Sequence, residues 1–270
     1  MGAEAYPAAK TAIHPNRSFA TGRTTLALIL REMVTTYGRS PGGYIWALLE
    51  PVAGIALLSF AFSLAFQAPS LGRNFPLFYA TAYLPYMLFH DVAGKTATAI
   101  RFSRPLLNFG AVSWFDVITA RFLLTTMTHL MITIIVLSGI IWFSDLNMSP
   151  DMGAAAKALA MGATLALGVG VLNCYLFLAF PVWERIWVVA TRPLFIISGV
   201  FFLFEDIPAA LQAYLWFNPL FHVTGQMRLG FYPTYSADYI SPAYAFGLGC
   251  ALLFVGLAAL SRAADGLIHK

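Results

Sequence analysis

Six long apolar stretches, separated by short polar or proline-rich breaks, dominate the pattern of this chain. They cover approximately residues 44–66, 76–99, 118–143, 154–180, 188–204 and 243–262. The first stretch holds a single charge, Glu50, and as a helix it extends about 34 Å, enough to cross a hydrocarbon core of about 30 Å. The pattern therefore predicts an all-α integral membrane protein with six transmembrane helices.

The stretch before the first span predicts a helix that lies along the membrane rather than across it. Residues 23–37 place apolar side chains on one face and polar side chains on another. The apolar set is Leu26, Ile29, Leu30, Met33 and Tyr37, and the polar set is Arg31, Glu32, Thr35 and Thr36. This amphipathic helix is too polar to span, so we expect it at the inner interface with its apolar face toward lipid.

The stretch between the fifth and sixth spans is apolar but cut by four prolines. They are Pro208, Pro219, Pro233 and Pro242, and they leave pieces too short to cross the bilayer. A single crossing here would also move the basic C-terminus to the outside. We therefore expect residues 205–242 to form a re-entrant helical hairpin. The predicted domains are a cytoplasmic tail (1–22), the interface helix and junction (23–43), the membrane domain (44–262) and a second tail (263–270).

Composition and charge agree with this layout. The 270 residues are 59% hydrophobic and only 10% charged, whereas soluble domains carry about 25% charged residues. Of the 16 Lys and Arg residues, the predicted outer segments hold only Arg73, Lys157 and Arg228. The remainder lie inside or near the inner boundary, which favours cytoplasmic N- and C-termini. The basic residues are dispersed rather than clustered, so nucleic-acid binding is not predicted. The polar N-terminus predicts no cleavable signal peptide.

One predicted span carries a signal for close helix packing. Gly162, Ala166 and Gly170 recur every four residues within 154–180. Small residues at this spacing let a neighbouring helix approach closely.

The chain lacks the short motifs of metal-dependent or nucleophilic catalysis. The sequence contains no HExxH, CxxC or GxSxG, and its five histidines fall in different predicted segments. Gly94-Lys95-Thr96 matches the end of a phosphate-binding loop, but Phe89 stands where the motif needs glycine. We therefore predict no metal, no cofactor and no ATP hydrolysis in this chain, which is not an enzyme by itself.

Charged residues near the inner boundary are candidates for a substrate path. Asp91 and Lys95 are four residues apart and can pair on one helix face, and charges inside the membrane are functional candidates. The alternative is a boundary pair that reaches to water. Arg39, Arg101 and Arg104 could hold an anionic lipid carrier or an acidic polymer at the inner mouth, or could simply enforce topology.

Aromatic side chains are concentrated in the predicted hairpin. The cluster consists of Tyr214, Trp216, Phe217, Phe221, Phe231, Tyr232 and Tyr235. Flat apolar rings stack on sugar faces, and their polar atoms can bond hydroxyl groups. The alternative is that these rings are boundary anchors.

Four stretches together resemble the permease subunit of bacterial capsular-polysaccharide exporters, which are ABC type-2 transporters. They are residues 37–51, 104–108, 192–202 and 217–222, the last accompanied by Arg228. O-antigen export permeases are close relatives of this family. The chain departs from the family at Leu203-Phe204-Glu205, where members often have proline after the paired phenylalanines.

The resemblance implies an inner-membrane homodimer that works with two cytoplasmic ATPase subunits, which bind ATP and Mg. It implies export of lipid-linked capsular polysaccharide, with periplasmic and outer-membrane export proteins as further partners. It also implies that residues 23–37 are the interface helix. The ATPase-coupling loop would comprise Phe102, Ser103, Arg104, Pro105, Leu106 and Leu107. The periplasmic gate would include Tyr214, Trp216, Phe217, Asn218, Pro219, Phe221, Arg228 and Tyr232.

Several alternatives stay open. The substrate could be O-antigen, another cell-surface polysaccharide, or a small lipid or drug. A membrane-embedded enzyme would need a polar catalytic cluster at one membrane face, and the sequence shows none. A passive channel would function without any ATPase.

Overall fold

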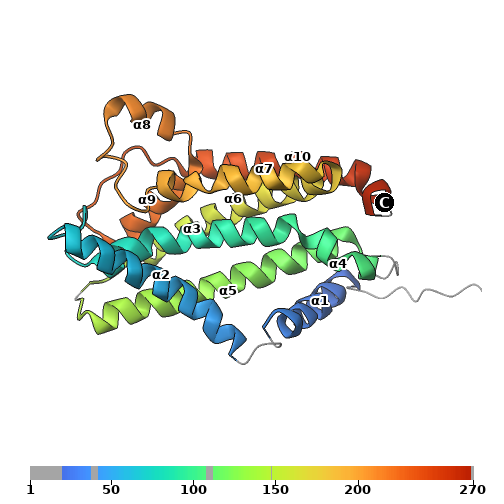
Figure 1. The fold of residues 1–270 in the computed structure, drawn as a ribbon, viewed down its shortest axis with the longest axis horizontal. Helices are drawn as coiled ribbons and strands as arrows, with labels where there is room; N and C mark the ends of the chain where they lie inside the picture. Colours follow the sequence, from blue (N-terminus) through green and yellow to red (C-terminus); the bar gives the residue numbers. More distant parts are fainter. Residues whose placement is uncertain (1–19, 38–41, 108–111, 147, 269–270) are drawn as a thin grey trace, which may run out of the picture.

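The computed structural model describes residues 20–37, 42–107, 112–146 and 148–268, and every regular element in these ranges is helical. The long helices α2 (Gly43–Ala65), α3 (Phe75–Ala97), α5 (Trp114–Phe143), α6 (Met152–Ala179) and α10 (Pro242–Ile268) form a bundle (Figure 1). At one end lie α1 (Ala20–Tyr37), α4 (Ala99–Leu107) and the end of α10, here called the α4 end (Figure 1). At the opposite end lies α8 (Ala209–Leu215), and we call this the α8 end (Figure 1).

Four helices of the described chain are long and apolar enough to cross a membrane. They are Ile45–Ala65, Trp114–Phe143, Met152–Ala179 and Pro242–Ala263. These four agree with the predicted first, third, fourth and sixth spans. The chain is therefore a helical membrane protein by length and composition of its helices.

Helix α3 is the centre of the bundle. It packs against α2, α5, α6 and α9 (Pro219–Phe231), and most of its side chains are buried. Gly162 and Gly170 of α6 face it, because a Cβ on Gly170 would lie 2.7 Å from the Thr96 Cβ. Ala166, between them, is fully buried. The predicted small-residue seam is thus confirmed as the place where α6 meets α3.

The predicted fifth span is wrong as a single helix over 188–204. The structure has α7 (Pro181–Thr191), which begins seven residues before the predicted span, and a separate 3-10 helix η1 (Pro193–Ser198). Pro193 has no N–H to continue the α-helical ladder, and Gly199 then takes a left-handed φ of 75°. The helical path therefore ends before residue 204.

Residues 100–117, which the hydrophobic pattern leaves between the second and third predicted spans, are largely helical. They contain α4 and the first turn of α5, with residues 108–111 outside the described chain. The Ser113 hydroxyl accepts a bond from the Asp116 N–H, and the Asp116 carboxylate accepts one from the Ser113 N–H. This capping box begins α5 at Trp114, four residues earlier than the hydrophobic pattern indicated.

The predicted hairpin consists of two short helices, α8 and α9, with different surroundings. None of the α8 side chains is buried, whereas almost all of those in α9 are. Helix α9 packs on α3, α6 and α10 inside the bundle. The two-helix form matches the prediction, and its depth in a membrane stays a prediction.

Candidate functional site

The helix α4, identified by resemblance as the ATPase-coupling segment, lies with one face on the bundle and one face outside. Ser103 and Leu107 are buried, and Leu106 is partly buried against the core. Phe102 is 45% exposed, and Pro105 is also exposed. Of the six candidate residues, Ser103 and Leu107 thus belong to the packed face.

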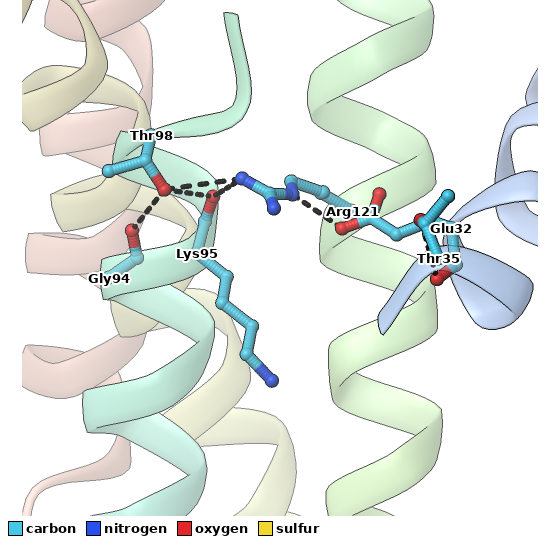
Figure 2. Close-up of polar contacts among 6 residues, drawn as sticks. All are labelled: Glu32, Thr35, Gly94, Lys95, Thr98 and Arg121. Atoms are coloured by element: carbon cyan, nitrogen blue, oxygen red, sulfur yellow. Dashed lines mark hydrogen bonds and ion pairs between the residues drawn. The ribbon is translucent and has the colours of Figure 1, made fainter. Parts of the chain in front are cut away.

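Arg121 of α5 contacts α1 and the end of α3 (Figure 2), and it also contacts α4. Its Nε donates to Oε1 of Glu32 in α1 at 2.5 Å. Its Nη1 donates to the carbonyl oxygen of Lys95 at 3.3 Å and to the Thr98 hydroxyl at 3.2 Å, where α3 ends. Its guanidinium carbon lies 4.1 Å from the centre of the Phe102 ring in α4. One side chain therefore contacts α1, α3 and α4.

The electrostatics of this arrangement favour a fixed geometry. Both side chains of the Arg121–Glu32 pair are about nine-tenths buried, so each charge depends on the other for compensation. A cation at the C-terminal end of α3 is also favoured by the helix dipole. The guanidinium face adds a cation–π contact with Phe102.

Neither residue of this pair was a candidate from the sequence. Glu32 was placed on a solvated face of the amphipathic helix, but it points into the bundle, while Leu26 and Leu30 are exposed. Arg121 lies inside the predicted third span, and a charge within an apolar run is the signal that could have identified it.

Arg101 ties the other side of α4 to α6 and α7. Its Nη1 lies 2.7 Å from Oε2 of Glu184, and its Nη2 donates to the Phe177 carbonyl at 3.3 Å. The positive charge of Arg101, a candidate for the inner mouth, is therefore paired with the carboxylate of Glu184. Arg104 is half-buried on α4, and Arg39 lies outside the described residues.

Asp91 is paired with α5 rather than with its own helix. Its Oδ2 lies 3.0 Å from Nε2 of His129, and the described ion pairs include none between Asp91 and Lys95. Both residues line a cavity of about 350 Å³ between α2, α3 and α5 that also includes Glu50, Trp46 and His129. The structure thus brings Asp91 and Lys95 together in one polar cavity, with His129 as a further member.

A second cavity, of about 410 Å³, lies on the opposite side of α3 against α6 and α7. Its walls include Tyr86, Phe89, His90 and Trp187, with the His90 ring stacked on Tyr86 at 6.0 Å. Sequence reasoning missed this cavity because the predicted fifth span begins at residue 188, so Trp187 fell outside the predicted helices. An aromatic residue just before an apolar run was the available signal.

The candidate gate residues are divided between surface and interior. Tyr214 and Phe217 are exposed on or next to α8, whereas Phe221 and Tyr232 are buried. Trp216 donates from Nε1 to the Tyr239 carbonyl at 3.0 Å. The aromatic cluster of the hairpin is therefore largely packed upon itself.

Asn218 and Pro219 fix the start of α9. The Asn218 side-chain oxygen accepts a bond from the Leu220 N–H at 3.1 Å, and Pro219 occupies the first turn. The Asn218 amide also donates to the Ile197 carbonyl at 2.6 Å. These contacts join the hairpin to η1.

Arg228 is a buried cation in α9, only 1% exposed. Its guanidinium carbon lies 4.4 Å from the centre of the Phe78 ring, and Nη1 donates to the Phe202 carbonyl at 3.3 Å. Nε and Nη2 have no hydrogen-bond partner among the described residues. The charge count placed Arg228 in an outer segment, but here it lies inside the helical core.

The segment between α9 and α10 packs tyrosines over this region. Burial raises the pKa of Tyr239 to about 12, so its hydroxyl stays protonated near neutral pH and donates to the Phe221 carbonyl at 3.3 Å. Burial likewise raises the pKa of Tyr235, whose hydroxyl donates to the Glu205 carboxylate at 3.1 Å. These neutral donors hold the segment against α9 and against the stretch between η1 and α8.

The described residues contain no group of three His, Cys, Asp or Glu side chains that could hold a metal ion. The geometry provides one polar cavity and one largely aromatic cavity beside α3, and a short helix, α4, fixed to its neighbours at one end of the bundle.

Residues 23–232 match the ABC-2 type transporter family, so the chain belongs to this family of membrane transport proteins. Three similar proteins have names more specific than that of the family. The chain is 29% identical over 241 residues to the polysialic acid transport protein KpsM of Escherichia coli, covering 87% of this chain and 91% of the relative. It is 28% identical over 245 residues to the capsule polysaccharide export inner-membrane protein CtrC of Neisseria meningitidis serogroup B, with 89% and 91% covered. It is also 27% identical over 249 residues to BexB of Haemophilus influenzae, another capsule polysaccharide export inner-membrane protein, with 91% and 93% covered.

Proposed function

We propose that this chain is the transmembrane subunit of an ATP-driven exporter that moves lipid-linked capsular polysaccharide across the bacterial inner membrane. The observation that carries the proposal is similarity over almost the whole chain to inner-membrane proteins of capsule polysaccharide export. The chain is not an enzyme by itself in this proposal. ATP and Mg are bound by a separate ATPase subunit.

The proposed topology has six spans and cytoplasmic termini. Four spans are the apolar helices described above. Helix α3 is the second span in chain order, because its 23 residues are long enough to cross and it packs between α5 and α6. The kinked pair α7 and η1 forms the remaining span. Helices α8 and α9 then form the re-entrant gate on the periplasmic side, which places the α4 end in the cytoplasm.

The proposed assembly is a homodimer with two ATPase subunits. A hydrophilic polymer needs a water-filled path, and the six spans of one copy are few to enclose it. Two copies supply enough helices. The exposed side of α4, with Phe102 and Pro105, supports a contact with the ATPase at the α4 end. Periplasmic and outer-membrane export proteins would carry the polymer onward.

Deletion of the gene in an encapsulated host tests this function. We expect polysaccharide to accumulate inside the cell and to disappear from the surface, with surface polymer restored by the gene in trans. Normal surface capsule in the deletion strain would contradict the proposal. If a different surface polymer accumulated instead, the proposed substrate would be wrong and the proposed role as an exporter subunit would stand.

A further inference from the structure

Arg121 contacts its neighbours through different atoms of its side chain. Nε donates to Glu32 of α1 and Nη1 donates to the Lys95 carbonyl at the end of α3 (Figure 2), while the guanidinium carbon lies over the Phe102 ring of α4. The Lys95 side chain points away from Arg121, so its ammonium group does not compete for these partners (Figure 2). Helix α1 and the consecutive helices α3 and α4 therefore meet at one residue of α5.

We propose that Arg121 is the positioning residue that makes α1, α4 and α5 move as one unit, so that displacement of α4 is transmitted into the membrane domain. This inference rests on the proposed function, because it takes the displacement of α4 to come from an ATPase. Arg121 contacts no substrate in this proposal. It acts through the helices that it holds.

The two sides of α4 differ in how firmly they are held. On the Arg121 side, the ion pair with Glu32 is nearly fully buried, so its geometry is shielded from water. On the other side, the Arg101 and Glu184 side chains are 45% and 35% exposed, and such pairs contribute little. When α4 moves, we therefore expect α1 and α5 to move with it, because Arg121 holds these helices to α4 more firmly than the Arg101–Glu184 pair holds α7.

Lysine cannot replace arginine in this arrangement. A lysine ammonium is a point charge that can keep the pair with Glu32, but it lacks the separate N–H groups with which Arg121 binds Glu32 and α3 while its guanidinium carbon lies over Phe102. Arg121→Lys thus preserves the charge and removes the link between α1 and α4. Arg31→Lys is a matched control, because Arg31 is exposed on the same helix as Glu32.

The test uses the full complex, this chain with its ATPase, reconstituted in vesicles with lipid-linked polysaccharide. ATP hydrolysis and polymer transport are measured in the same preparation. For Arg121→Lys we expect ATP hydrolysis near the wild-type rate and transport per ATP lowered about fivefold or more, the size of a moderate coupling between sites. We expect Arg31→Lys to behave as wild type.

A distance measurement separates coupling from simple loss of stability. Spin labels at Val34→Cys in α1 and Pro105→Cys in α4, with Cys250→Ser to remove the exposed native thiol, report the separation of the two helices. In the wild type the distance should be the same without nucleotide and in the trapped ATP state. In Arg121→Lys it should differ between the two states.

If Arg121→Lys fails to assemble, the exchanged pair Glu32→Arg with Arg121→Glu keeps opposite charges but not the stack on Phe102. We expect it to assemble and to remain uncoupled. Wild-type transport per ATP in either variant overturns the inference and leaves the proposed function standing. Failure of both to assemble also overturns it, because Arg121 is then required for folding. Absence of ATP-dependent transport in the wild type overturns the proposed function itself.

Discussion

Gly168 of α6 and Gly249 of α10 face each other so closely that the Gly249 carbonyl oxygen occupies the space of a Cβ on Gly168. The relationship continues along the same helices, since a Cβ on Gly256 would lie 2.7 Å from the Leu172 backbone nitrogen. Helices α6 and α10 therefore pack backbone to backbone. Without a hydrophobic driving force between helices in lipid, such close packing is a main source of stability.

Gly168→Ala should accordingly destabilise the protein. The added methyl group meets backbone that cannot rotate away, so we expect a loss of about 1–3 kcal/mol in the free energy of unfolding. Thermal unfolding in detergent measures it. The control is Gly139→Ala in α5, where nothing lies within 4 Å of the new Cβ, and this variant should unfold at or above the wild-type temperature. Equal midpoints for both variants would contradict the packing of α6 on α10.

Asp91 and His129 should be energetically coupled, because their side chains meet at 3.0 Å between α3 and α5. A double-mutant cycle of Asp91→Asn and His129→Gln is expected to give an interaction of about 0.5–3 kcal/mol in unfolding free energy. Denaturation in mixed micelles measures each corner of the cycle. Asp91→Asn combined with Ser138→Ala, an exposed change on the same α5, should be additive. Additivity in both cycles would show that the pair does not form.

Arg228→Met should lower transport, because Arg228 belongs to the proposed gate helix α9, without lowering stability. Among the described residues Arg228 has no ion pair with a carboxylate, so its burial costs free energy that the Phe78 contact only partly offsets. We expect the free energy of unfolding to stay constant or rise by about 1 kcal/mol, because methionine fills similar space without a charge. Arg73→Met, in the exposed segment before α3, is the matched control and should leave both quantities unchanged. A large loss of stability in Arg228→Met would contradict the prediction, because it would show that interactions in the folded protein compensate the buried charge.

The two ends of the bundle should lie on opposite sides of the membrane. Tyr214, which is 77% exposed on α8, can be replaced by cysteine to report the α8 end, and Pro105→Cys reports the α4 end. In a Cys250→Ser background, we expect a membrane-impermeant thiol reagent to label Tyr214→Cys from the periplasm of cells with an intact inner membrane. Pro105→Cys should react only after that membrane is opened. Labelling of Pro105→Cys in intact cells would reverse the proposed topology.

Hydropathy predicted the long helices well because each of them is a continuous apolar run. The first span, expected at 44–66, is α2 at Gly43–Ala65, and the sixth, expected at 243–262, lies within α10. The amphipathic pattern also predicted α1. Such features depend on local sequence, which a single chain displays directly.

The features of the fold and of the site that were not predicted depend on contacts that a single sequence does not display. Glu32 and Arg121 are 89 residues apart, so their pairing follows from the three-dimensional arrangement. The hydrophobic pattern did not indicate helix α4, because its sequence is short and polar; only the family resemblance placed a coupling segment there. The fifth span failed where Pro193 and Gly199 stop a hydrophobic run that composition alone reads as continuous. Arg228 was counted in an outer segment, because the sequence does not show that α9 packs against Phe78 inside the bundle.

ATP-driven movement of polysaccharide by the reconstituted complex is the most direct test of the central claim. This chain and its ATPase are placed in vesicles, lipid-linked capsular polysaccharide is supplied on the ATPase side, and protected polymer is measured with time. The proposal predicts transport that requires both ATP and this chain. Hydrolysis without any transport of the polymer, or transport that continues without ATP, would contradict it.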